Sequence, residues 1–153
     1  MFRILIPAAL ALVLAACASG ARMDGAERLA LYRAHAGEPV GSIRHPGRFT
    51  GWSAVGTDAL VLRTRPNEAF LLELSTPCPD LPVALAIQVS SRTGMISARF
   101  DSVTPLGPAT ASIRVPCHIG SIRPLDVAAL REAEAALREA TLVERADQAP
   151  TAD

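Results

Sequence analysis

The chain has 153 residues, with 15 basic and 15 acidic side chains, so its formal net charge at pH 7 is zero. A neutral balance lacks the basic surface by which proteins bind nucleic acid, and an aromatic content of 4% leaves few platforms on which bases could stack. We therefore expect no nucleic-acid partner, and the length suits one domain of modest size.

The chain starts with a short basic head, Met1-Phe2-Arg3, followed by an apolar run from Ile4 that ends just before Cys17. A basic head, a brief apolar run and small residues at its end are typical of a secretory signal peptide. A membrane-spanning helix takes roughly 20 apolar residues, and this run is shorter and contains Pro7. We therefore predict a signal peptide over residues 1–16 and not a retained membrane span.

The end of the apolar run, Leu14-Ala15-Ala16-Cys17, resembles the lipobox of bacterial lipoproteins. The resemblance implies cleavage before Cys17, diacylation of its thiol and acylation of the new amino terminus. Two or more acyl chains anchor a protein stably, whereas one holds it only marginally. In lipoproteins of Gram-negative bacteria, a residue other than Asp after the lipidated cysteine implies the outer membrane, and Ala18 fits this rule. We expect a lipid-anchored protein of the bacterial outer membrane that faces the periplasm and contacts the membrane through Cys17.

Two cysteines remain for the folded part of the chain, Cys78 and Cys117. In an oxidising compartment they most simply pair with each other, and closing so long a loop stabilises the fold by about 4 kcal/mol. Two reduced, buried thiols are the alternative. The sequence has neither the Cys-x-x-Cys spacing nor the four ligands that a zinc site usually needs, so we predict a disulfide and no metal.

A lipidated tether over residues 17–23 is predicted to lead into a single globular domain over residues 24–146. Asp24 and Glu27 have the spacing of a helix capping box, and the helix that they open is predicted to end near Ala36. Gly37 and Pro39 stop it. Residues 37–48 are interpreted as an irregular connection between this helix and the β core.

A β core is predicted over about residues 49–122. The hairpin around Pro66 has the clearest pattern, because proline favours the second position of a type I turn. Three prolines exclude regular structure from residues 76–82, and residues 104–109 form a second proline-rich loop. Residues 95–103 are predicted to pair with residues 83–90, and the last segment is one strand or two short ones. The segments with a strand pattern are 49–55, 59–64, 69–75, 83–90, 95–103 and 110–122.

A C-terminal helix is predicted over about residues 125–145 with Asp126 as its N-cap, followed by a disordered tail at residues 147–153. The sequence Leu-Arg-Glu-Ala occurs twice in it, too few times to indicate a coiled coil, so we expect a helix that packs on the sheet or partly projects. Strands joined by tight turns argue against a parallel sheet. The expected fold is mainly β (α+β), a small antiparallel sheet or barrel-like domain with an N-terminal helix and a C-terminal helix.

Several short motifs together resemble a family of small proteobacterial lipoproteins that is known only as a domain of unknown function. The likeness covers roughly residues 48–126 and implies a lipoprotein that faces the periplasm. It implies no activity, substrate or catalytic residue. The motifs are Trp52, the hairpin from Arg63 to Leu74, Cys78-Pro79-Asp80-Leu81, Phe100-Asp101-Ser102-Val103 and Cys117-His118-Ile119-Gly120-Ser121-Ile122.

Residues with catalytic potential do not form a recognisable constellation. Cys117 and His118 are neighbours, but adjacent side chains on a strand point to opposite faces, and a cysteine in a disulfide cannot act as a nucleophile. The three histidines, with Asp80 and Asp101, lack the spacing of metal ligands. We expect no cofactor, no metal and no enzymatic activity.

Arg63 and Arg65 lie two residues apart and would share a strand face, which makes them a candidate anion-binding or lipid-headgroup face. The alternative is a solvated face with cross-strand ion pairs, in which Glu73 lies across the hairpin. The expected function is a non-enzymatic binding or envelope-structural role toward an unknown envelope protein or component. The alternative function is a small-ligand-binding protein or a hydrolase-like enzyme with a site near Trp52, Arg63 and Asp101. An assembly role of the C-terminal helix is a third hypothesis.

Overall fold

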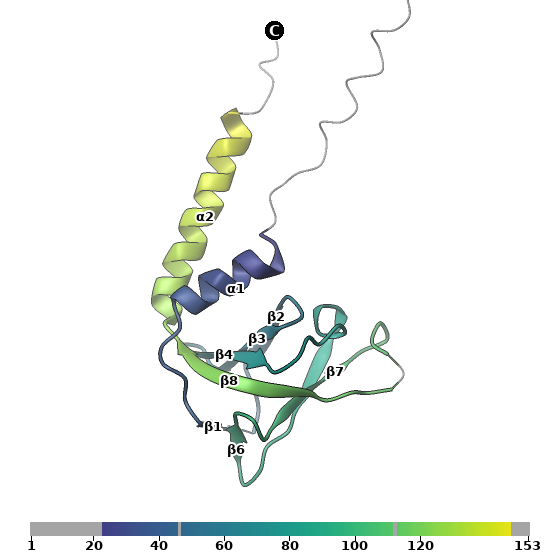
Figure 1. Ribbon diagram of the computed structural model, residues 1–153. Helices are drawn as coiled ribbons and strands as arrows, with labels where there is room; N and C mark the ends of the chain where they lie inside the picture. Colours follow the sequence, from purple (N-terminus) through teal and green to yellow (C-terminus); the bar gives the residue numbers. More distant parts are fainter. Residues whose placement is uncertain (1–22, 46, 112, 148–153) are drawn as a thin grey trace, which may run out of the picture.

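The structure is a computed structural model that describes residues 23–45, 47–111 and 113–147 (Figure 1). The predicted signal peptide, the acylation site Cys17 and all but the first residue of the predicted tail lie outside the described residues. No helix of the described part is long and apolar enough to cross a membrane.

Two antiparallel sheets and two α-helices make up the described part of the chain, which confirms the predicted mainly-β, α+β class. The larger sheet has six strands in the order β2-β3-β4-β8-β7-β5, and β1 pairs with β6 in a two-stranded sheet. The strands are β1 (Ser42–Arg44), β2 (Gly51–Val55), β3 (Ala59–Arg65), β4 (Glu68–Leu74), β5 (Ala86–Val89), β6 (Met95–Ser97), β7 (Ser102–Leu106) and β8 (Cys117–Leu125).

The β3–β4 hairpin forms as predicted, and its alternating side chains supply the core on both faces of the sheet. Leu60 pairs with Leu72, and both belong to the main core cluster, which also contains Cys78 and Cys117. Val61 pairs with Leu71, and both belong to a second cluster on the opposite face. All four side chains are fully buried. Successive side chains of a strand point to opposite faces, so both faces of the sheet are covered here.

The helix α1 (Gly25–Ala34) covers the second cluster with Leu29 and Tyr32. Its predicted capping box is present, because the Asp24 carboxylate accepts the Glu27 N–H at 2.8 Å and the Glu27 carboxylate accepts the Asp24 N–H at 3.2 Å. The helix start is therefore fixed by side chains that satisfy main-chain donors without an intrahelical partner.

The helix α2 (Val127–Asp147) begins as predicted at Asp126, whose Oδ1 accepts the N–H groups of Ala128 and Ala129. Leu130 is buried in the second cluster, beside α1. Figure 1 shows the later half of α2 standing away from the sheet. Large apolar side chains there are exposed, among them Leu142 and Val143. The helix thus packs through its first turns and then projects.

Residues 83–90 do not form one strand, contrary to the prediction. Val83 belongs to η1 (Leu81–Val83), one turn of 3-10 helix that buries Leu81, and β5 begins only at Ala86. Pro82 favours this turn because its ring presets a helical φ and its missing N–H costs nothing in a first helical turn.

The predicted partner segment, residues 95–103, is also divided. Only its end, in β7, pairs with β5, whereas β6 pairs with β1 in a stretch that was predicted to be irregular. Strands of three residues such as β1 are too short to show a period, and this pairing joins positions about fifty residues apart. The last strand starts at Cys117 and extends to Leu125, since it pairs with β4 up to Ala69.

Candidate functional site

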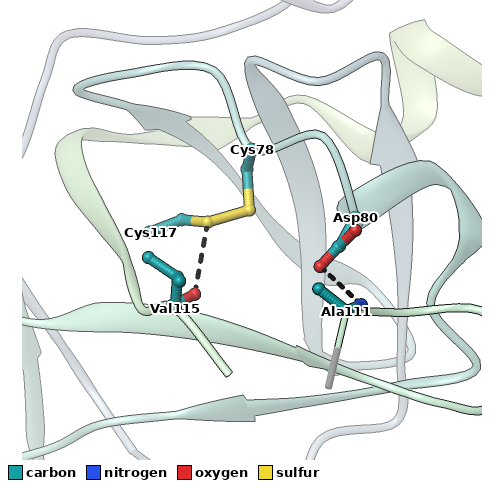
Figure 2. Close-up of a disulfide and its surroundings, with 5 residues drawn as sticks. All are labelled: Cys78, Asp80, Ala111, Val115 and Cys117. Atoms are coloured by element: carbon teal, nitrogen blue, oxygen red, sulfur yellow. Dashed lines mark hydrogen bonds between the residues drawn. A yellow bond between two sulfur atoms is a disulfide. The ribbon is translucent and has the colours of Figure 1, made fainter. Parts of the chain in front are cut away.

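The predicted disulfide between Cys78 and Cys117 is present, with 5.9 Å between the two Cα atoms (Figure 2). It joins the proline-rich loop after β4 to the first residue of β8, two segments separated by 39 positions in the sequence. Both cysteines are buried, and they belong to the main core cluster. The Cys117 sulfur lies 3.8 Å from the Val115 carbonyl oxygen. A sulfur in a disulfide carries no hydrogen, so this contact is not a hydrogen bond.

A second tie joins the same two loops. The Asp80 Oδ2 accepts the Ala111 N–H at 3.0 Å, as Figure 2 shows beside the disulfide. Asp80 also lies directly before η1, although its side chain forms no cap hydrogen bond there. The disulfide and this hydrogen bond hold the loop after β4 against the loop that leads into β8.

Strands β7 and β8 diverge at this point. They pair only at Ser102 with His118 and at Val103 with Cys117, whereas β7 stays paired with β5 as far as Leu106. Two prolines stand just beyond the last pair, Pro105 on β7 and Pro116 before β8. Proline has no N–H with which to continue a ladder, so the two strands separate and leave a fork.

The fork holds a cavity of about 330 Å³. This volume is at the lower end of the range of ligand pockets, about 300–1,000 Å³. No sequence motif predicted this site, although Ile113 and Val115 alternate as in a strand and lie next to two proline-rich loops. Its walls are prolines, aliphatic side chains and the disulfide: Pro77, Cys78, Pro79, Pro105, Ile113, Val115, Pro116 and Cys117, with Thr76, Asp80 and Ala111.

Glu73 is the centre of a charged network, but its partners differ from those expected. Its Oε1 accepts Nε of Arg33 at 2.7 Å, its Oε2 accepts the Ser121 hydroxyl at 2.8 Å, and Arg123 Nε lies 3.5 Å from Oε2. Burial by itself raises the pKa of Glu73, but the hydrogen bonds and the two arginine charges outweigh it and lower the pKa below 4.5. The network ties α1 to β4 and β8, which is a structural role.

Arg63 and Arg65 lie on either side of a register irregularity in β3. Arg63 pairs with Ala69 and forms no ion pair with a described residue, whereas Arg65 Nη1 lies 3.6 Å from a Glu68 carboxylate oxygen. Glu73 lies opposite Ala59 and not opposite either arginine. An anion-binding role for Arg63 and Arg65 stays a prediction.

The three residues of the alternative site do not converge. Trp52 pairs with Leu62 and packs against the main core cluster, and Arg63 is the next residue of β3, so its side chain points to the other face. Asp101 is 1% exposed; its Oδ1 accepts the Ser90 hydroxyl and its Oδ2 accepts the Ser97 N–H, both at 2.8 Å. Its carboxylate is therefore used to hold the turn before β7.

The neighbours Cys117 and His118 do not form a nucleophile–base pair. Cys117 is oxidised, and His118 next to it is exposed while Cys117 is buried, in agreement with opposite strand faces. Among the residues that the structure describes, no group of three His, Cys, Asp or Glu side chains could hold a metal ion.

Comparison with known proteins gives a family and no further relative. No curated protein matches the chain, and no solved structure matches it. Residues 1–141 match a family of unknown function, DUF6491. The resemblance to a domain of unknown function is thereby confirmed, and the chain belongs to the DUF6491 family.

Proposed function

We propose that this chain is a periplasmic lipoprotein, anchored to the outer membrane by acyl chains on Cys17, whose small disulfide-stabilised β domain binds an envelope component without catalysing a reaction. The observation that carries the proposal is the use of its three cysteines. One stands at the end of a signal-like leader, and the other two are joined.

The disulfide supports export. Structural disulfides persist in oxidising compartments and are rare in the cytosol, where thiol systems keep cysteines reduced. The Cys78–Cys117 pair also leaves Cys17 as the single cysteine available for acylation. A signal-like leader, a cysteine available for acylation and a disulfide in the folded domain all fit a protein that is exported from the cytosol.

The surroundings of the fork cavity support binding. General acid–base catalysis needs titratable groups that are free to exchange protons with a substrate. Glu73 and Asp101 are held in structural hydrogen bonds away from the cavity, and Asp80, the carboxylate that lines it, accepts the Ala111 N–H. The cavity itself is lined mainly by apolar groups, which suits recognition of an apolar partner.

Metabolic labelling tests the proposal. Cells that express the chain are grown with labelled palmitate, and the Cys17→Ala variant is compared with Cys78→Ala, which removes a cysteine of the folded domain. Label in the natural chain and in Cys78→Ala, and none in Cys17→Ala, is the expected result. A natural chain that takes up no label and is recovered from the cytosol with three free thiols would overturn the proposal.

A further inference from the structure

Three residues before β8 have main-chain groups without a hydrogen bond. Within the described part of the chain, the N–H and C=O groups of Ile113, Arg114 and Val115 have no such partner. Figure 1 shows the chain before β8 leaving the strand toward this loop, and the chain bends at Ile113. Main-chain groups of this kind are strong donors and acceptors, and an unpaired row of them is a template for another strand.

Apolar side chains are exposed around the same stretch. Ile113 is 79% exposed and Val115 is 64% exposed. Leu85, 75% exposed, lies on the other side of β7, where its N–H donates to the Leu106 carbonyl oxygen. Ile113 and Val115 both line the fork cavity, so exposed apolar side chains stand at its edge. Clustered apolar exposure marks protein interaction surfaces.

The charge of this surface selects the kind of partner. The segment 74–91 has a single charged residue, Asp80, and the segment 103–117 has a single one, Arg114. Asp80 already accepts a hydrogen bond from Ala111. Opposite single charges leave a neutral surface, so a charged segment would find no counter-charges here and would lose its hydration. An uncharged, apolar segment is complementary to it.

We propose that Ile113–Pro116 and the fork cavity form a strand-addition site for an extended, uncharged apolar segment of a second protein. The main chain of that segment pairs with the free groups of residues 113–115, and side chains at alternate positions of the segment enter the cavity over the Cys78–Cys117 disulfide. The inference rests on the binding role proposed above and names its site and the chemistry of its partner.

The main chain around the fork cavity is restrained in the free protein. Pro77, Pro79, Pro105 and Pro116 restrict the main chain around the cavity, and the disulfide holds its two sides together. Docking on such a surface loses less conformational entropy than docking on a free loop. A short segment can therefore bind with useful affinity.

A synthetic strand tests the site directly. The purified full-length protein, isotopically labelled and held in detergent micelles, is titrated with the capped peptide acetyl-Val-Thr-Val-Thr-Val-Thr-amide and followed by NMR. The expected result is a shift and slower hydrogen exchange of the Ile113 and Val115 amides. A peptide with N-methyl groups at alternate residues cannot pair and is expected to bind at least about tenfold more weakly. Unchanged amide signals, or equal binding of both peptides, would overturn the proposal.

Surface variants locate the binding. Ile113→Asp and Val115→Asp change exposed side chains, so the fold is retained and peptide affinity is expected to fall about tenfold. Leu142→Asp on α2, at a position that is 64% exposed, is the matched control and is expected to bind as the natural chain does. An equal loss in all three variants would contradict the assignment of this surface.

Two other outcomes are separable. A free protein that is a dimer, and that Ile113→Asp converts to a monomer, would show that a second copy of the chain occupies the surface and would overturn the assignment of a different partner. A chain without acyl groups that still binds the peptide would overturn only the membrane anchor. An acylated chain that does not bind would overturn only this site.

Discussion

Removal of the disulfide is the perturbation whose magnitude follows most directly from the structure. The bridge closes a loop between positions that are 39 apart. In the loop-entropy treatment, a loop of that length restricts the unfolded chain enough to stabilise the folded state by about 4 kcal/mol. Natural domains are stable by about 5–15 kcal/mol, so the bridge accounts for a large part of the total. We expect the Cys78→Ala/Cys117→Ala variant to be folded but marginal.

Urea unfolding measures this loss. Trp52 is the single tryptophan and packs against the core cluster that contains both cysteines, so its fluorescence reports on unfolding of this core. The natural protein in reductant and the double variant are both expected to lose about 4 kcal/mol of unfolding free energy. Cys17→Ala is the control and should lose none. A loss below about 1 kcal/mol, or a double variant that reductant still destabilises, would refute the reasoning.

Three further substitutions test contacts that hold the helices and the turn before β7. Glu73→Gln weakens the bonds to Arg33 and Ser121 and is expected to lower the unfolding free energy by about 1–3 kcal/mol at pH 7. Because the pKa of Glu73 is lowered in the folded state, its contribution to stability is complete above pH 4.5 and is lost as the pH falls through the folded-state pKa. Urea unfolding at several pH values should therefore show that the unfolding free energy of Glu73→Gln falls less steeply toward acid pH than that of the natural protein. An equally steep fall in both proteins would contradict this. Tyr32→Phe removes the hydroxyl that donates to Glu134 at 3.1 Å and should cost about 1 kcal/mol in the same assay, whereas no change would mean that the contact between α1 and α2 contributes nothing. Asp101→Ala leaves the Ser90 hydroxyl and the Ser97 N–H without an acceptor and is expected to lower the unfolding free energy by about 2–4 kcal/mol, which a thermal melt that matches the natural protein would disprove.

The parts of the fold that could be predicted are those that local chemistry decides. The capping residues Asp24 and Asp126 act on main-chain groups two or three positions away, and the β3–β4 hairpin is joined by a short turn with a clear period of two. The disulfide was predictable for another reason, because only two cysteines remained once Cys17 was assigned to the predicted acylation site.

The parts that could not be predicted depend on pairing between distant segments. Nothing within Ser42–Arg44 indicates that β6 is its partner, and the alternation of residues 83–90 was misleading because Pro82 starts a helical turn. The fork cavity arises where β7 follows β5 and β8 follows β4 in different directions. Such a site depends on the register of four strands, which one sequence does not reveal.

Intact-mass spectrometry of the protein extracted from membranes decides whether Cys17 carries the acyl anchor. We expect a chain that begins at Cys17, carries the mass of a diacylglyceryl group and a third acyl chain, and lacks two hydrogens at Cys78 and Cys117. A chain that begins at Met1, or a Cys17 that reacts as a free thiol with an alkylating reagent, would contradict it.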